Sequence, residues 1–153
     1  MAALVEFLVR AGVCVVFAWA GISKLQSPTG TLLGIYQYRL LSWEASAQAA
    51  ALLPWVECLT ALGLWIPRLR LGAGALGIAL CLVFLGALGS AWARGLDIAC
   101  GCFGSVDVDH LLLARMGEDL VLLGACIWLY RRALPAAPFP PDEKLPICND
   151  PAN

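Results

Sequence analysis

Four apolar blocks dominate the chain and limit the folds that it can adopt. They span residues 4–22, 47–66, 71–92 and 111–130. Each is close to the roughly 20 residues that an α-helix needs to cross a bilayer. Hydrophobic residues make up 61% of the chain, against about 45–50% in soluble domains. We therefore predict an all-α integral membrane protein, a four-helix bundle in the lipid bilayer that covers residues 1–134.

The first block reads as a helix of the mature protein rather than as a cleaved signal peptide. It carries Glu6 and Arg10, and no small-residue cleavage site precedes a soluble body. The net charge of −1 also gives no basic footprint for nucleic acid. The sequence therefore predicts that the chain stays in the membrane and has no nucleic-acid partner.

Two further segments lie outside the four blocks. Residues 29–46 are too apolar and aromatic for a free linker. We predict a short interfacial segment there, and it is open whether this is a helix at headgroup level or a loop tucked onto the bundle. Residues 135–153 form a proline-rich tail, which we expect to be extended and to lie along a partner protein.

Basic residues set the predicted orientation. Arg68 and Arg70 occupy the short link between the second and third blocks, and Arg131 and Arg132 end the fourth. Lys144 in the tail adds to the same side. The opposite side holds one basic residue fewer, namely Lys24, Arg39, Arg94 and Arg115. The positive-inside rule then predicts a multi-pass inner-membrane protein with both termini cytoplasmic and the loop after the third block on the exported side.

That loop contains two cysteines separated by one glycine. Residues 99–104 read Ala-Cys-Gly-Cys-Phe-Gly. A disulfide needs Cα atoms about 4.4–6.8 Å apart, which Cys100 and Cys102 reach only if the chain turns at Gly101. The small ring would be strained, and strained disulfides are the labile or catalytic ones. Cys100 and Cys102 are therefore candidates for a thiol–disulfide pair. A Cu(I) or zinc site with incomplete ligands and an inert turn stay open as alternatives.

The remaining cysteines read differently. Cys14, Cys58, Cys81 and Cys126 fall one in each block and are interpreted as small apolar packing residues, not as metal or haem ligands. Cys148 lies in the tail. With the predicted topology it is cytoplasmic and cannot resolve a disulfide with the loop cysteines, whereas on the same side it would be a third redox candidate.

Charges inside the membrane are costly and are usually paired or functional. Counted from the inner ends of their blocks at 1.5 Å per residue, Arg10 and Glu57 lie about 9 Å and about 13 Å deep. We predict an Arg10–Glu57 pair, with Glu6 one turn from Arg10 as a second partner. Two interpretations are open. The pair fixes helix register, or it carries protons for a redox reaction.

Several of these residues together resemble a known family. Ala20–Leu25, Ile35–Leu41, Leu53–Glu57, Arg94-Gly95 and Cys100–Gly104 are similar to the motifs of the MauE branch of the DoxX-like membrane proteins. The resemblance covers about residues 8 to 130, and its most specific part is Cys-Gly-Cys-Phe-Gly. It implies a four-helix membrane bundle with a role in methylamine utilisation.

The resemblance also implies a partner and a chemistry. MauE proteins are thought to help the small subunit of periplasmic methylamine dehydrogenase acquire its disulfides, together with a thioredoxin-like protein. By that analogy Cys100 and Cys102 exchange with an exported thioredoxin-like protein or a maturing disulfide-containing protein. A quinone could carry the electrons, although no residue points to its site. The alternatives are a non-catalytic structural subunit of a larger membrane complex and a Cu(I)-handling protein.

Overall fold

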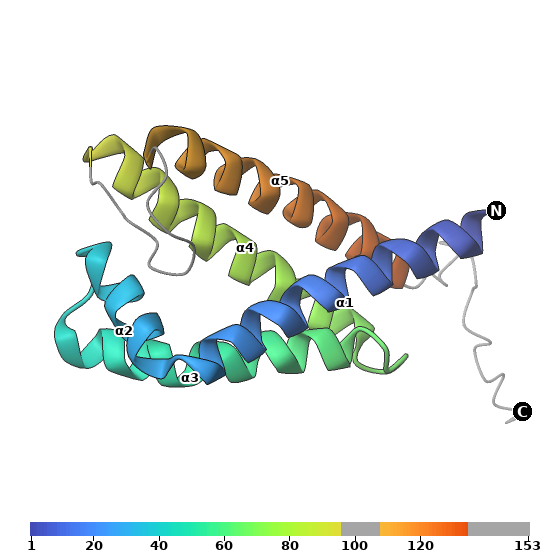
Figure 1. Ribbon diagram of the computed structural model, residues 1–153. Coiled ribbons are helices and arrows are strands. Elements are labelled where there is room, and N and C mark those ends of the chain that lie inside the picture. The colour runs from blue at the N-terminus through green and yellow to red at the C-terminus, as the bar shows by residue number, and fades with distance from the viewer. Residues whose placement is uncertain (96–107, 135–153) are drawn as a thin grey trace, which may run out of the picture.

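The computed structural model describes residues 1–95 and 108–134 (Figure 1). These residues form five helices: α1 (Ala2–Gln26), α2 (Pro28–Gln37), α3 (Trp43–Gly63), α4 (Arg70–Ala93) and α5 (Val108–Ala133). The all-α prediction is confirmed for this part of the chain. The predicted cysteine loop and the whole of the predicted proline-rich tail fall in 96–107 and 135–153, outside the described residues.

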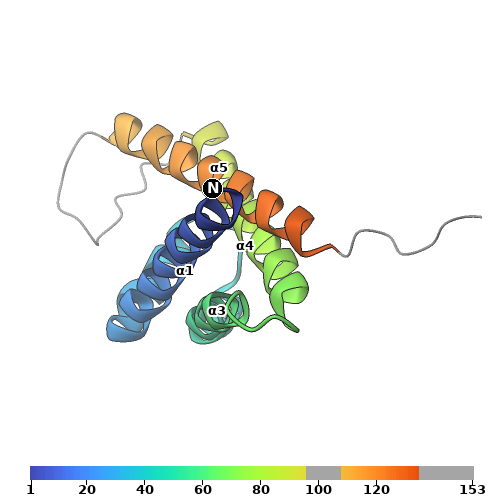
Figure 2. The same ribbon diagram turned by 90° about the vertical axis from the view of Figure 1, so that its right-hand side faces the viewer.

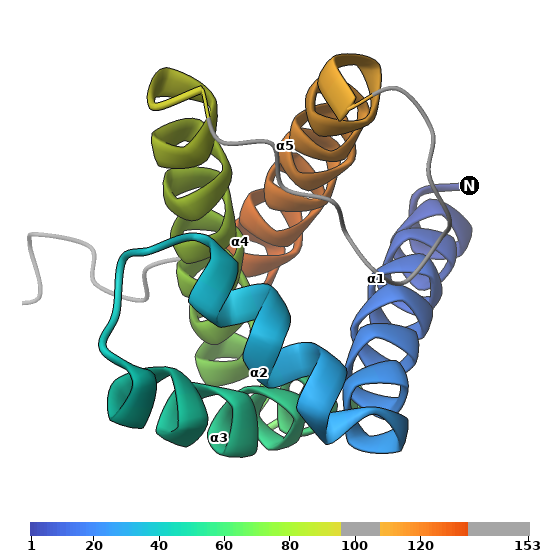
Figure 3. The same cartoon turned by 60° about the vertical axis from the view of Figure 1, so that its left-hand side comes forward.

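The long helices associate as two antiparallel pairs. Helix α1 packs along α3, and α4 packs along α5. Further contacts of α3 with α4 and of α1 with α5 join the pairs, as seen from the end at which α1 begins (Figure 2). Helix α2 lies across the other end of the molecule, where it packs on α3 (Figure 3).

The burial pattern is that of a protein whose solvent is lipid. Within the described residues, the largest fully buried side chains are Glu57, Thr60, Cys81, Cys126 and Ser46. Large apolar side chains face outward instead, among them Trp19 at 71% exposure and Val121 at 75%. Soluble proteins bury such side chains, whereas a bilayer solvates them. Small residues inside let the helices approach closely.

Three of the described helices, α1, α3 and α4, are long and apolar enough to cross a membrane. They correspond to the first three apolar blocks. Helix α5 contains the fourth block but is not among the three, and it carries Arg115, Glu118 and Asp119 in its first half. A membrane protein is therefore supported by the structure, and a fourth span stays a prediction.

The helix boundaries differ from the predicted ones around the first connection. We expected the first helix to end near residue 22, but α1 continues to Gln26. It ends where Pro28 begins α2 as the first helical residue, a position that suits the fixed φ of proline. Helix α3 starts earlier than expected, at Trp43, because the Ser42 side chain accepts a hydrogen bond from the Ala45 amide and caps the first turn.

The interfacial segment combines the two predicted forms. It is helical over Pro28–Gln37 and it also packs on α3. Tyr36 and Trp43 meet edge to face, with ring centroids 5.3 Å apart. This aromatic contact holds the end of α2 next to the start of α3.

Candidate functional site

Helices α1 and α3 come unusually close at Gly21. A Cβ atom built on this glycine would stand 2.6 Å from the Cys58 sulfur and 2.9 Å from the Pro54 carbonyl oxygen. Only a residue without a Cβ allows the two backbones this approach. The Ala20–Leu25 and Leu53–Glu57 motifs are therefore the two sides of one helix contact.

One turn beyond that contact, Lys24 meets Glu57. The Lys24 Nζ lies 2.8 Å and 3.0 Å from the two carboxylate oxygens of Glu57, and 3.5 Å from the Ala20 carbonyl oxygen. The Glu57 side chain is 1% exposed and that of Lys24 is 25% exposed. A carboxylate this deeply buried needs a compensating partner, and Lys24 supplies both charge and hydrogen bonds.

Groups from α4 and α5 face the pair. The Lys24 ammonium lies over the Phe84 ring, 5.5 Å from its centroid, which is within cation–π range. Asp119 of α5 also lies within electrostatic range of Lys24. Lys24 therefore contacts groups of both α3 and α4, and Glu57 is the acidic group in direct contact with it.

The predicted Arg10–Glu57 pair is wrong. Glu57 pairs with Lys24, and Arg10 pairs with Glu6, the partner predicted as secondary. The prediction assumed that the two helices start level at the inner surface. Instead Phe7 packs edge to face on Trp65, which sets Arg10 close to Leu64. Seven residues of helix, about 10 Å, separate that level from Glu57.

Lys24 was not predicted as a site residue, because the first helix was expected to end near residue 22, which leaves Lys24 among the charges outside the membrane. One signal could have found it. Gly21 and Lys24 are three residues apart in α1, so they lie on the same helix face. A glycine that faces a helix contact places the following turn against the same neighbour.

A substitution at Gly21 tests whether this contact holds the site. We expect Gly21→Ala to destabilise the protein by about 1–3 kcal/mol, because the added methyl group overpacks against a backbone oxygen. Gly12 in the same helix has nothing within 4 Å of its built Cβ, so Gly12→Ala should be neutral or stabilise by up to about 1 kcal/mol. Unfolding of both variants by SDS in mixed micelles gives the comparison. Equal stabilities would contradict the close approach.

Arg94 organises the end of the molecule nearest the cysteine segment. Its guanidinium donates hydrogen bonds to the backbone carbonyl oxygens of Tyr38 at 2.5 Å, Arg39 at 3.4 Å and Ser90 at 3.0 Å. Arg39 adopts a left-handed conformation with φ 50°, which turns the chain out of α2. Arg94 thus joins the end of α2 to the end of α4, two residues before the segment 96–107 begins.

The described cysteines lie between the packed helices. Cys14, Cys81 and Cys126 are buried, Cys58 is half-buried, and all four are free thiols. The Cys14 thiol donates to the Ala61 carbonyl oxygen at 3.2 Å, and the Cys126 sulfur lies against Gly77. These positions suit the packing role predicted for them. Cys100, Cys102 and Cys148 lie outside the described residues.

The fold and site define a helical membrane protein with a lysine–glutamate pair buried between its first two long helices. The chain belongs to the MauE family, since a sequence model of that family, described as methylamine utilisation protein MauE, matches residues 1–132. The resemblance inferred from the motifs is therefore confirmed.

Two relatives carry the name methylamine utilization protein MauE. The protein from Methylophilus methylotrophus is 38% identical over 91 residues, which are 59% of this chain and 48% of the relative. The protein from Paracoccus denitrificans is 35% identical over 138 residues, 88% of this chain and 72% of the relative. The first alignment thus spans about half of its relative. No solved structure gives a significant match to the chain.

Proposed function

We propose that the protein is a membrane-embedded thiol–disulfide redox protein that assists disulfide formation in an exported partner. Cys100 and Cys102 are the exchanging thiols of this proposal. The relatives' names point to methylamine utilisation, so the partner is an exported protein that acquires disulfides in that process, or a thioredoxin-like protein that serves it.

The placement of the other cysteines carries the proposal. Three of the four described thiols are buried in the helix interior, and Cys58 is half-buried between α1 and α3. A visiting protein cannot bring its sulfur in line with a thiol that is packed between helices. Thiol exchange with a partner therefore falls to the two cysteines of the connecting segment, which are separated by one glycine in sequence.

The positions of the helix ends support an orientation in which this exchange takes place on the exported side. The end of α4 and the start of α5, which flank the segment in sequence, lie at the end of the molecule that α2 covers (Figures 1 and 3). Arg10, Arg70 and Arg132 gather at the opposite end. The positive-inside rule then places that opposite end in the cytoplasm and the cysteine segment on the exported side. In this topology α5 is the fourth span.

One turnover needs the Cys100–Cys102 disulfide and a partner dithiol, and the next turnover needs an oxidant, such as a quinone, that takes two electrons from the reduced pair. A partner thiolate attacks one sulfur of the Cys100–Cys102 disulfide, which breaks that bond and forms a mixed disulfide. The second partner thiolate then attacks the mixed disulfide, which leaves the partner oxidised and Cys100 and Cys102 reduced. A small strained ring favours this direction because reduction releases its strain.

Alkylation of whole spheroplasts tests the proposal. We expect a membrane-impermeant maleimide to label Cys100 and Cys102 only after mild reduction, because the pair is a disulfide on the exported side. A Cys100→Ser/Cys102→Ser variant should lose this labelling, and Cys148→Ser, which removes the tail thiol, should keep it. Labelling without reductant under every condition would favour a non-catalytic structural subunit. Labelling only after the cytoplasmic side is opened would contradict the topology.

A further inference from the structure

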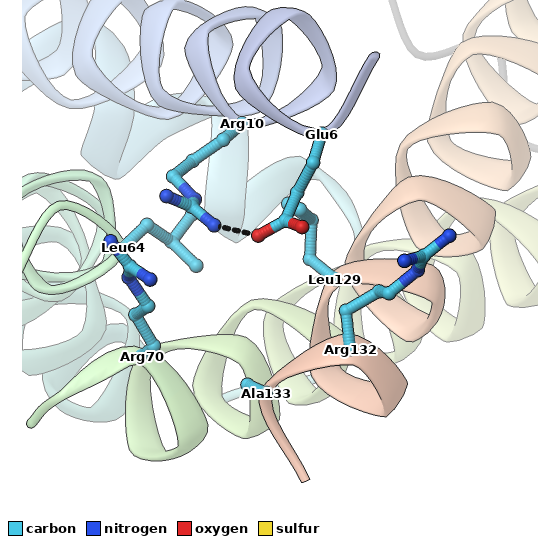
Figure 4. Close-up of a pocket in the computed structure, with 7 residues that line it drawn as sticks. All are labelled: Glu6, Arg10, Leu64, Arg70, Leu129, Arg132 and Ala133. Carbon is cyan, nitrogen blue, oxygen red and sulfur yellow. Dashed lines mark hydrogen bonds and ion pairs between the residues drawn. The ribbon is translucent and has the colours of Figure 1, made fainter. Parts of the chain in front are cut away.

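A basic pocket lies at the end of the molecule opposite α2, between α1, α4 and α5. Its volume is about 40 Å³, and it is lined by Glu6, Arg10, Leu64, Arg70, Leu129, Arg132 and Ala133 (Figure 4). Arg10 of α1, Arg70 of α4 and Arg132 of α5 thus line the pocket together with one carboxylate, and the guanidinium of Arg132 lies away from the other two (Figure 4). Neither the ion pair at Lys24 nor the cysteine chemistry accounts for this cluster.

The positive charge of the pocket is not balanced within the described residues. Glu6 is engaged by Arg10, and neither Arg70 nor Arg132 forms an ion pair in this part of the chain. Arg132 stacks on the Trp128 ring, 5.0 Å from its centroid, which fixes its guanidinium without neutralising it. The Arg70 Nε is buried and has no hydrogen-bond partner among the described residues.

The N-terminus of α4 adds to the positive charge of the pocket. Helix α4 begins at Arg70, and its N-cap residue Leu69 provides no side-chain hydrogen bond. The amides of its first turn are therefore uncapped, and a helix N-terminus carries a partial positive charge that favours anions. A buried unpartnered guanidinium N–H at the same place indicates that an acceptor from outside the described chain completes the site.

The surroundings indicate the source of that acceptor. Four residues next in sequence to lining residues have exposed apolar side chains: Phe7 at 51%, Trp65 at 44%, Leu69 at 52% and Leu134 at 45%. These side chains lie at the ends of apolar helices, where headgroups meet acyl chains. A ligand that brings both an oxyanion and hydrocarbon satisfies the arginines and these apolar side chains together.

We propose that the pocket binds the phosphate oxyanion of an anionic phospholipid headgroup. A guanidinium matches phosphate oxygens through two parallel hydrogen bonds, and basic pockets between helices on the cytoplasmic side suit such headgroups. The small volume admits the oxyanion alone, so the rest of the lipid lies against the exposed apolar side chains. The bound lipid ties α1, α4 and α5 together at this end.

Native mass spectrometry of the full-length protein in dodecyl maltoside micelles tests the assignment, with phosphatidylglycerol, phosphatidylcholine and inorganic phosphate as separate probes. We expect phosphatidylglycerol to bind most tightly. Arg70→Gln and Arg132→Gln should each weaken it about tenfold, because each removes a charge-assisted hydrogen bond. The matched controls are Arg68→Gln and Arg131→Gln, which make the same charge change at exposed sites outside the pocket and should stay within about twofold.

A variant that is expected to bind the lipid more tightly serves as a control, because misfolding cannot produce a gain of affinity. Glu6→Gln removes the one carboxylate of the pocket and frees Arg10, so phosphatidylglycerol should bind several-fold more tightly. Equal losses in Arg70→Gln and Arg68→Gln would overturn the proposal, as would the absence of any phosphatidylglycerol binding. Saturation by inorganic phosphate without preference for the lipid would assign the site to a free phosphate and overturn the lipid source.

Discussion

Replacing Lys24 with methionine should destabilise the protein by about 3 kcal/mol, because it leaves a buried carboxylate without its partner. Glu57 is 1% exposed and takes both of its ion-pair contacts from Lys24. Methionine keeps most of the length of the side chain but removes the charge and the cation–π contact with Phe84. Unfolding of the variant by SDS in mixed micelles, followed by helical circular dichroism, measures the loss.

The two partners should not be equivalent. Glu57→Met leaves the charge of Lys24, which is 25% exposed and can extend its flexible stem toward headgroups, so we expect a smaller loss of about 1–2 kcal/mol. The double variant Lys24→Met/Glu57→Met should recover at least half of the loss seen in Lys24→Met, since no unpaired charge remains. Glu118→Gln breaks the exposed Arg115–Glu118 pair and should cost at most about 1 kcal/mol. A double variant as unstable as Lys24→Met would contradict this account.

The double variant also separates the two interpretations of the buried acid. If the pair only fixes the register of α1 against α3, the folded double variant keeps its disulfide exchange. If Glu57 accepts or releases protons during exchange, the variant folds but exchanges slowly, and the pH dependence of the wild-type rate disappears in Glu57→Gln. The geometry favours register, because the pair continues the Gly21 contact directly.

The membrane fold was predictable from sequence because it depends on block length and hydropathy alone. The positions of helix ends were not, because they depend on local contacts. The first helix was expected to end near residue 22, just after Gly21, but in lipid a glycine is tolerated inside a helix wherever a neighbour packs on it, and here Pro54 and Cys58 do so. Ser42 as an N-cap then brought the start of α3 forward to Trp43.

The site was predictable only in part, for a related reason. Glu57 could be identified as a buried charge from its place in an apolar block. Its partner could not, because depth counted from block ends ignores the stagger between helices, which side-chain contacts such as Phe7–Trp65 set. The basic pocket could not be predicted from the sequence for the same reason. Arg70 and Arg132 served as orientation signals in the sequence, and only the fold brings them together with Arg10.

Removing either cysteine of the connecting segment should abolish disulfide exchange, because the remaining thiol cannot form the Cys100–Cys102 disulfide that the partner thiolate attacks. The two single variants should nevertheless differ. In the reverse direction, the thiolate of the more nucleophilic cysteine attacks the disulfide of an oxidised partner, which forms a mixed disulfide and releases one partner thiolate. The variant that keeps this cysteine and lacks the other cannot resolve the mixed disulfide with its own second thiol, so it accumulates the mixed disulfide with the exported partner.

Expression of Cys100→Ser and Cys102→Ser in cells, followed by acid quenching and non-reducing electrophoresis, distinguishes the two roles. We expect one variant to show an additional band at higher mass that reductant removes, and the other to show none. Cys58→Ser, at the half-buried thiol between α1 and α3, and Cys148→Ser in the tail should both retain exchange. Both expectations follow because neither of those sulfurs has a neighbouring cysteine in sequence. A loss of exchange in Cys148→Ser would instead assign the resolving role to the tail cysteine. Full exchange in the Cys100→Ser/Cys102→Ser variant would instead show that the reaction does not use this pair.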